Sequence, residues 1–375
     1  GTYVGSDGLI KTSPVNLLTY SEEFDQSVWT KIGSIAANVE LAPDGSQTAD
    51  RTAYVSTRWI IFDNSNSASL PGFPQDYPFT VTDKWERQST TFTTPSGCTS
   101  VRFYPLRSSD NSQWIYQIAS GLTSNTTYTA SAYYKLAADN VTVLAWGAQV
   151  EEGTTATDYI PTGATISGAP RFDHDPVTGE SLGLLIEEER TNKMLSSENL
   201  MVGSTWQRLD GATSSLSNIT SPDGVSKMWL VNLPTQGTSS SGSRVYQQNL
   251  AFNNVVNTFS FYARSVSGTG TFPVGYYNGG DYIKSYVTLT EQTQRYEISC
   301  PAGLDTGIFA FTRRGTTHNE TLTQAYIWGC QSETGSFPTS YIPTTGSTVT
   351  RAPDIATIEG NKFAKTNLLT YSERF

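Results

Sequence analysis

The sequence predicts an all-β protein built of tandem jelly-roll β-sandwich modules joined by β-hairpin connectors. Aromatic and β-branched residues favour strands, and the 375 residues include 20 Tyr, 16 Phe and 8 Trp. Short runs such as 128–134 and 258–263 alternate apolar and polar side chains, as half-buried strands do. Similar landmarks recur along the chain, which indicates a repeated module. Roughly eight or nine such strands per repeat is the number expected of a two-sheet sandwich.

The repeat is anchored by a nine-residue segment. NLLTYSEEF at 16–24 matches the last nine residues, 367–375, at eight positions, and a degenerate copy begins at Asn192. The copies start about 176 residues apart, and we expect the chain to be a window on a longer array. Three further landmarks recur in the same order: Trp29 with Trp206, Pro43-Asp44-Gly45 with Pro222-Asp223-Gly224, and WGAQVEEGTTATDYIPT from Trp146 with WGCQSETGSFPTSYIPT from Trp328. A tryptophan that recurs in a repeat is most simply a core residue, so we expect these four to be buried.

The landmarks predict the domain organisation. Between the two modules, the turn sequence Asp-Pro-Val-Thr-Gly at 175–179 separates an aromatic arm from an aliphatic arm, which is typical of a hairpin. The expected parts are a connector at 1–15, a first jelly-roll module at 16–162, a hairpin connector at 163–191, a second module at 192–344, a connector at 345–366 and the start of a third repeat at 367–375.

One pair of strands occupies different places along the two modules. In the second module, segment 244–265 precedes 286–300, whereas in the first module the similar segment 114–135 follows 80–94. Either the first module has a permuted strand order, or this similarity pairs the wrong strands. The sequence leaves both interpretations open.

Charge and cysteine content exclude several classes of function. The net charge is −10 and the pI about 4.8, and such a surface repels phosphate backbones, so we expect no nucleic-acid partner. The longest apolar runs are a few residues, so we expect no membrane insertion. Cys98, Cys300 and Cys330 are odd in number and lack paired spacing, which does not make a disulfide framework. We expect buried free thiols in a protein that folds in a reducing compartment.

The motifs together resemble those of a known family. The openings NLLTYSEEF with a following Trp, the closings WGAQVEEG with YIPT, and the connector PRFDHDPVTGESLGLLIEEERTN resemble bacteriophage structural proteins, in particular fibre and virion-surface proteins of marine and cyanobacterial phages. The module itself is similar to jelly-roll carbohydrate-binding modules. The resemblance covers nearly the whole chain except the variable middle of each module.

This resemblance implies a homotrimeric fibre, or an appendage on the capsid or tail, that is assembled in the host cytoplasm and exposed on the virion surface. Other virion proteins and host surface polysaccharide are the implied partners. No cofactor is expected, although a structural calcium ion is compatible with a jelly roll.

Candidate sugar-binding residues are aromatic side chains with polar neighbours, because pyranose rings stack on aromatic faces while amides and carboxylates bind the hydroxyls. Trp59 and Trp229 are also candidates. For every candidate the competing interpretation is that the side chain packs in the core or contacts another subunit. The set that we predict is the loop-like stretch Tyr276, Tyr277, Asn278, Asp281 and Tyr282 together with Trp85 and Trp114.

Catalytic and metal sites are not predicted. The chain has two histidines: His318, expected to be solvated, and His174, expected in a hydrogen-bonded corner. Adjacent carboxylates at 151–152 and 187–189 point to opposite faces of a strand and make a poor glycosidase pair, so we expect them to be solvated.

Asp44 and Asp223 are weak calcium candidates, with a plain turn role favoured. We therefore expect a non-enzymatic virion attachment protein. The alternatives are a secreted bacterial array of carbohydrate-binding modules and, less favoured, a glycosidase.

Overall fold

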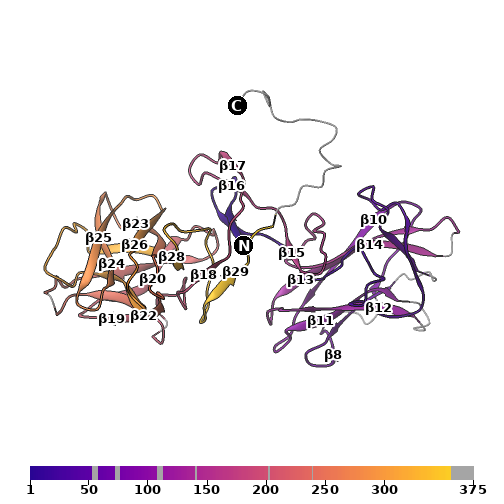
Figure 1. Cartoon of the computed structure of the whole chain (residues 1–375), viewed down its shortest axis with the longest axis horizontal. Coiled ribbons are helices and arrows are strands. Elements are labelled where there is room, and N and C mark those ends of the chain that lie inside the picture. Colours follow the sequence, from indigo (N-terminus) through magenta and orange to yellow (C-terminus); the bar gives the residue numbers. More distant parts are fainter. Residues whose placement is uncertain are drawn as a thin grey trace, which may run out of the picture. The chain divides into compact units, whose positions relative to one another are not determined.

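The structure is a computed structural model that describes residues 1–52, 58–71, 77–107, 113–139, 142–201, 203–238 and 240–355 (Figure 1). All regular elements in these residues are β-strands, which confirms the all-β class. The chain divides into two compact units. We call Ser13–Ala169 the first unit, and Gly1–Thr12 together with Pro170–Phe375 the second unit. The predicted start of a third repeat at 367–375 lies outside the described residues.

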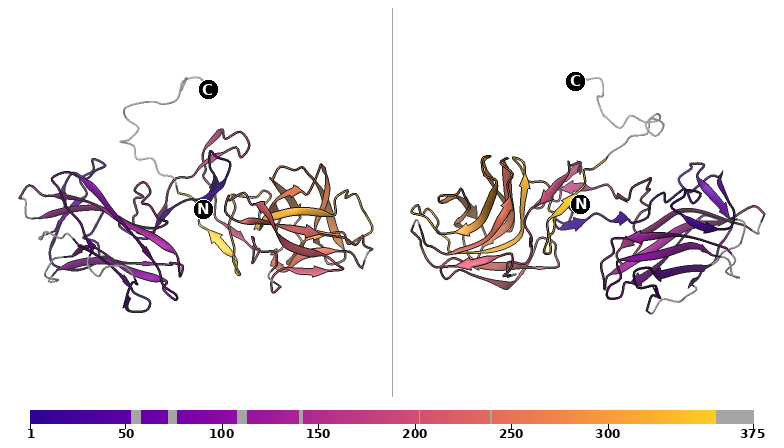
Figure 2. Two further views of the ribbon diagram at one scale, coloured as in Figure 1. Left: turned by 180° about the vertical axis from the view of Figure 1, so that it is seen from behind. Right: turned by 60° about the horizontal axis from the view of Figure 1, so that its bottom comes forward.

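Each unit contains a β-sandwich of two sheets, which we call the back sheet and the front sheet (Figures 1 and 2). The jelly-roll architecture predicted from the repeat is confirmed, and a hydrophobic core fills each sandwich. In the first unit the back sheet has the order β10 (Glu86–Thr93), β13 (Thr127–Leu136), β14 (Val143–Glu152), β6 (Ala49–Thr52), β5 (Ile35–Glu40), and the front sheet has the order β4 (Thr30–Ile32), β12 (Trp114–Ser120), β11 (Ser100–Arg107), β7 (Arg58–Asp63), β8 (Ala68–Ser69), with β9 (Tyr77–Pro78) also paired to β7.

The second unit repeats this arrangement. Its back sheet has the order β20 (Thr213–Thr220), β21 (Lys227–Asn232), β28 (Gln324–Thr334), β23 (Asn257–Ser265), β26 (Gln294–Cys300), and its front sheet has the order β19 (Gln207–Leu209), β22 (Arg244–Ala251), β27 (Thr306–Thr312), β24 (Gly270–Tyr277), β25 (Tyr282–Leu289). The remaining short strands form two-stranded ribbons: β1 (Thr2–Val4) with β2 (Ile10–Thr12), β3 (Val15–Asn16) with β15 (Ser167–Gly168), β16 (Phe172–His174) with β17 (Ser181–Leu184), and β18 (Arg190–Asn192) with β29 (Val349–Arg351).

The two sandwiches have the same spatial arrangement but a different order along the chain. In the second, β22 and β23 follow β21 directly, whereas their counterparts β12 and β13 come after β11 in the first. Gln117 on β12 and Gln247 on β22 identify the counterparts, because each accepts a hydrogen bond from the opening segment of its module, from Thr19 N at 2.7 Å and Leu195 N at 2.6 Å. The strand order of the first module is therefore permuted, the first of the two interpretations that the sequence left open.

A buried asparagine explains why each module opens with the same residue. Asn16 Nδ2 donates to the carbonyls of Ala148 and Ile160 at 3.0 Å, and its Oδ1 accepts from Leu18 N and Val150 N. In the second module Asn192 makes the four corresponding bonds, to Cys330 O, Ile342 O, Met194 N and Ser332 N. One side chain thus ties the opening segment to the closing strand and to the loop after it. The recurrent Asn of the repeat satisfies buried backbone groups that would otherwise lack partners.

The closing motif holds the same loop from the other side. Gln149 Oε1 accepts from Ile160 N at 2.8 Å, and Gln331 Oε1 accepts from Ile342 N at 2.6 Å. The recurring tryptophans are buried as predicted: Trp29 and Trp206 lie in the main cores, whereas Trp146 and Trp328 belong to smaller clusters on the back sheets. Cys98, Cys300 and Cys330 are buried free thiols, so the prediction that these side chains are buried and unpaired is confirmed.

Residues 1–12, expected within a connector at 1–15, form a hairpin that packs inside the second unit. Val4 N donates to Asp173 Oδ1 at 2.7 Å, and His174 Nδ1 lies 3.1 Å from Val4 O, so β1 lies beside the connector strand β16. Gly8, with φ 75°, allows the two hairpin tips to meet, because a Cβ there would lie 2.5 Å from Pro176 O. The first unit is thus an insertion between two hairpins that belong together.

A buried ionic cluster holds the connector to the second module. Arg171 Nη1 lies 2.7 Å from Glu187 Oε2, and Arg351 Nη1 lies 2.6 Å from the same oxygen. Ser340 donates to Glu187 through both its N and its Oγ, each at 2.7 Å. Burial opposes ionisation of Glu187, but the bonds from Ser340 and Arg171 and the charge of Arg351 outweigh it and lower the pKa of its carboxyl. The expectation that the carboxylates at 187–189 are solvated is therefore wrong for Glu187.

Candidate functional site

The outer face of the first unit's front sheet carries a group of neighbouring aromatic side chains. Side chains alternate across a strand, so Phe103 and Ile115 enter the core while Tyr104, Trp114 and Tyr116 point outward, where they are partly buried. The ring centroids of Tyr104 and Tyr116 are 4.8 Å apart, and those of Trp114 and Tyr116 are 5.4 Å apart. The strands β11 and β12 are adjacent, so the three rings form one surface, which we call the front-face aromatic group.

An arginine lies at the edge of this group. The guanidinium carbon of Arg102 is 5.5 Å from the ring centroid of Tyr116 and 5.6 Å from that of Phe62. Its Nε donates to Asn64 Oδ1 at 2.7 Å. Stacking against two rings together with one hydrogen bond holds the planar group in a defined orientation.

The second unit's front face is built differently. Tyr246, on β22, is 7% exposed, and Tyr282, on β25, is 6% exposed. Arg244 lies over Tyr246, and Arg314 lies over Tyr282 at 5.4 Å from the ring centroid. Burial raises the pKa of the Tyr282 hydroxyl to about 12. Arginine side chains thus cover the tyrosines that the sheet directs outward.

The structure separates the residues of the predicted stretch 276–282. Tyr276 is 9% exposed and belongs to the core, whereas Tyr277 stacks against Tyr282 with ring centroids 5.3 Å apart. Asn278 Oδ1 accepts from Gly280 N and Asp281 N, and Asp281 Oδ1 accepts from Tyr282 N, so both polar side chains shape the turn. The stretch therefore brings two rings together on the front face, and its amide and carboxylate are engaged in the hairpin.

The predicted tryptophans lie in different places. Trp114 belongs to the front-face aromatic group, but Trp85 packs on the back sheet against a cluster containing Trp146, with its Nε1 donating to Leu41 O at 3.1 Å. Trp59 and Trp229 are both buried in the cores, in line with the competing core interpretation. Of the predicted set, only Trp114 lies in the front-face aromatic group.

The weak calcium candidates close turns. Asp44 Oδ1 accepts from Ser46 N at 2.9 Å and from Ser46 Oγ at 2.6 Å. Asp223 Oδ1 accepts from Ser221 Oγ, Val225 N and Ser226 N. In the described part of the chain, three or more His, Cys, Asp or Glu side chains nowhere gather as a metal site.

Two expectations about polar residues were wrong because tertiary contacts bury them. Glu151 is 0% exposed and accepts bonds from Thr157 N at 2.9 Å and Gln149 Nε2 at 2.6 Å, so it ties the loop after β14. His318 is mostly buried, with Nδ1 at 3.1 Å from Glu320 Oε1 and Nε2 at 3.0 Å from Gly237 O. His174 occupies a hydrogen-bonded corner, as predicted.

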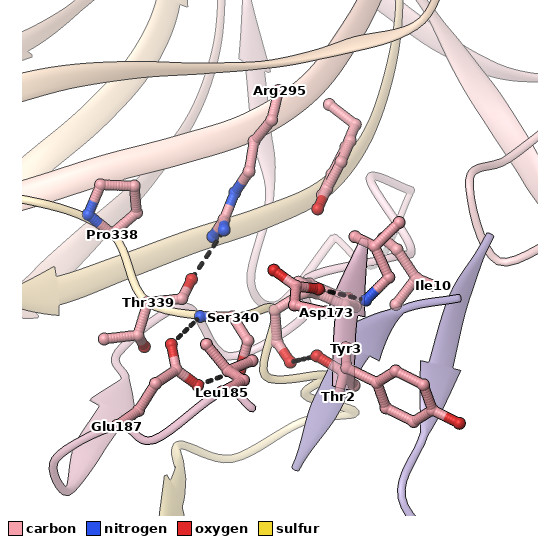
Figure 3. A pocket seen from close by; sticks show the side chains of 13 residues that line it. Thr2, Tyr3, Ile10, Asp173, Leu185, Glu187, Arg295, Pro338, Thr339 and Ser340 are labelled. Atoms are coloured by element: carbon pink, nitrogen blue, oxygen red, sulfur yellow. Dashed lines mark hydrogen bonds between the residues drawn. The ribbon is translucent and has the colours of Figure 1, made fainter. Parts of the chain in front are cut away.

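A cavity of about 250 Å³ lies in the second unit, between the hairpin β1–β2, the connector and the loop at 338–341 (Figure 3). Its charged side chains are engaged: Asp173 accepts from Val4 N, Glu187 accepts from Ser340, and Arg295 donates to Thr339 O at 2.7 Å. Arg87 makes the matching contacts in the first unit, to Thr157 O and Ser131 Oγ. The recurrence of this arginine indicates a scaffold role in both modules.

Sequence reasoning missed Arg102, Tyr104 and Tyr116. A signal was available in the sequence. Arg102 and Tyr104 are two positions apart in SVRFYPLR, and Trp114 and Tyr116 are two positions apart in WIYQI. Residues two positions apart on a strand lie on the same face. The pairing of these two strands, which places the rings side by side, is not contained in that pattern.

Comparison with known proteins gives matches among solved structures. No protein-family profile and no curated protein matches the chain. The tandem CBM22-1–CBM22-2 domain of Paenibacillus barcinonensis Xyn10C is 12% identical, with a TM-score of 0.32, over 87% of this chain and 99% of that one. The CBM22-1–GH10 modules of Clostridium thermocellum endo-1,4-β-D-xylanase 10B, solved with xylohexaose, are 12% identical with a TM-score of 0.28 over 41% of this chain.

An exo-β-agarase is 10% identical with a TM-score of 0.28 over 39% of this chain. The match spans 30% of the xylanase chain and 25% of the agarase chain. The solved structures that this chain resembles thus include carbohydrate-binding modules.

Proposed function

We propose that the chain is a non-enzymatic virion attachment protein, a fibre or a capsid or tail appendage, whose first module binds glycans of the host surface. The front-face aromatic group carries the binding part of the proposal. Tyr104, Trp114 and Tyr116 offer three adjacent ring surfaces on two rigid strands. Sugar rings stack their apolar C–H faces on such surfaces, and nearby polar groups bind the hydroxyls.

Engagement of the acidic and imidazole side chains supports a non-enzymatic role. A glycosidase needs two carboxyl groups facing each other across the scissile bond, but Glu151 and Glu187 hold backbone segments together. His174 and His318 are both hydrogen-bonded within the fold. These groups stabilise the modules, so we assign none of them a catalytic role.

The virion location rests on the resemblance of the module openings and the connector to phage fibre proteins. We propose a homotrimer that contacts other virion proteins, is assembled in the host cytoplasm and is exposed on the particle surface. Burial raises the pKa of the Cys98 thiol and of the Cys300 thiol to about 11. A protonated buried thiol is a poor nucleophile for disulfide exchange.

Substitution of the aromatic group tests glycan binding. We expect Trp114→Ala and Tyr116→Ala each to weaken binding to host polysaccharide about 5- to 30-fold, since stacking on one ring contributes about 1–2 kcal/mol. Trp85→Ala is the matched control, a tryptophan of the same module on the other sheet, and it should leave affinity unchanged. Equal losses for Trp85→Ala and Trp114→Ala, in variants that unfold at the wild-type temperature, would contradict the assignment to the front face.

A secreted bacterial array of carbohydrate-binding modules would use the same face and is the second candidate. Gold-labelled antibodies against the first module separate the two. Labelling at fixed positions on purified phage particles is expected. If the antibodies label protein in particle-free culture fluid and do not label particles, the virion proposal is wrong and the secreted array of carbohydrate-binding modules takes its place.

A further inference from the structure

We propose that the front face of the first module selects an anionic glycan, one bearing carboxylate or sulfate groups, and that Arg102 is the residue that binds the anion. This inference rests on the proposed glycan-binding function and names the chemical class of its ligand.

The charge distribution on the sheet favours an anion. The chain as a whole has a net charge of −10. In the described strands of this front sheet, however, the only carboxylate is Asp63, which is 1% exposed and accepts bonds from Asn66 N and Asn66 Nδ2. No acidic side chain on these strands is therefore open to repel an anion above the aromatic rings.

Arg102 is the cation best placed to meet a ligand. The same strands carry Lys31, Arg58 and Arg107. Lys31 donates to backbone carbonyls, including those of Phe24 and Gln26, and Arg58 and Arg107 each interact with other groups of the chain. Arg102 stands beside Tyr116, within the aromatic surface itself.

The contacts of Arg102 prepare its guanidinium for an anion. Its Nε donates a hydrogen bond to Asn64, and the rings of Phe62 and Tyr116 lie against the guanidinium. Within the described residues, Nε makes the one hydrogen bond of this guanidinium, which leaves the two terminal amino groups to donate to a ligand. A guanidinium held in a fixed orientation binds carboxylate or sulfate through two parallel hydrogen bonds and loses little conformational entropy in doing so.

The second module provides an internal comparison. Phe103 and Phe309 occupy matching positions, since they pair with Gln117 and Gln247. Arg102 therefore corresponds to Ile308. The arginine of the second module's β22, Arg244, lies 3.5 Å from Asp210 and has a carboxylate beside it already. Within the described residues, the position equivalent to Arg102 therefore holds no cation in the second module.

Binding to matched pairs of polysaccharides tests the inference. The probes are host polysaccharide, polygalacturonate and dextran sulfate, each beside a counterpart whose carboxyl groups are reduced or whose sulfates are removed. We expect the full chain to bind at least one acidic polymer and to bind its neutral counterpart at least about tenfold more weakly, because a charge-assisted bond to an ion is lost. Whether polygalacturonate or dextran sulfate binds shows whether the site recognises carboxylate or sulfate groups. Affinity should fall as salt is raised.

The variants separate Arg102 from general charge. Arg102→Gln should lose at least about tenfold in affinity for the acidic polymer, Arg102→Lys should retain part of it, and Arg244→Gln in the second module should change nothing. Each variant's unfolding temperature is measured beside wild type, and Arg102→Lys keeps the test valid if Arg102→Gln fails to fold. Equal binding to acidic and neutral partners, with Arg102→Lys at wild-type affinity, would overturn the inference and leave glycan binding intact. Absence of binding by wild type to every polymer would overturn the proposed function as well.

Discussion

Removal of the buried asparagine at the module opening should unfold one module and spare the other. Asn16→Ala deletes hydrogen bonds to Ala148 O, Ile160 O, Leu18 N and Val150 N. A hydrogen bond contributes roughly 1 kcal/mol net, and a buried group left without a partner costs at least as much. The four bonds predict a loss of about 4 kcal/mol for the first module, a large part of the stability of an ordinary domain.

Differential scanning calorimetry measures this loss. A fall of about 4 kcal/mol lowers the midpoint by about 8–16 °C in a domain of this size. Asn192→Ala is the matched control: it removes the four corresponding bonds of the second module and should move the other transition instead. Asn16→Asp should cost nearly as much, because its second oxygen would face two carbonyls. A decrease below about 1 kcal/mol for both Ala variants, or a shift of both transitions by either one, would refute the reasoning.

Three further outcomes are expected. Gly147→Ala should destabilise the first module by about 1–3 kcal/mol in urea unfolding, because φ is 65° and the new Cβ would lie 3.2 Å from the Tyr159 ring; a neutral result would contradict the strain. Burial raises the pKa of Asp50 to about 6 despite bonds from backbone amides, so the native state holds more protons than the unfolded state between about pH 4 and 6 and stability falls as pH rises through that window. This dependence of stability on pH should vanish in Asp50→Asn. If it persists in that variant, another titratable group causes it. Deletion of 13–169, with Thr12 joined directly to Pro170, should leave a folded second unit with its calorimetric transition unchanged, since the insertion begins and ends side by side; an unfolded product would show that the insertion is required.

The strands and the repeat were predictable because their signals are local. Alternation of apolar and polar residues is a property of neighbouring residues, so runs such as 258–263 identify strand β23 without knowledge of its partners. The recurring motifs could also be recognised. Their tryptophans proved buried, and their Asn and Gln side chains make equivalent bonds in both modules.

The binding candidates were harder to predict because a side chain's exposure depends on residues far away in the chain. Glu151 looked like a surface acid beside Glu152, but the loop that carries Thr157 folds over it. Tyr276 and Tyr277 were indistinguishable in the sequence, yet the parity of β24 sends the first into the core and the second to the front face. Long-range packing decided each case.

By itself the sequence determined the all-β class, the repeated module and the hairpin turn of the connector, since all three follow from local alternation, turn chemistry and self-similarity. Only the tertiary structure decided how strands separated along the chain pair with one another. That pairing produced the permuted order of the first module, returned residues 1–12 to the second unit, and set Arg102 and Tyr104 beside Trp114 and Tyr116. The sequence of a strand specifies which of its side chains share a face. Which strand pairs beside it depends on contacts between residues far apart in the chain, and a short segment of sequence does not specify those contacts.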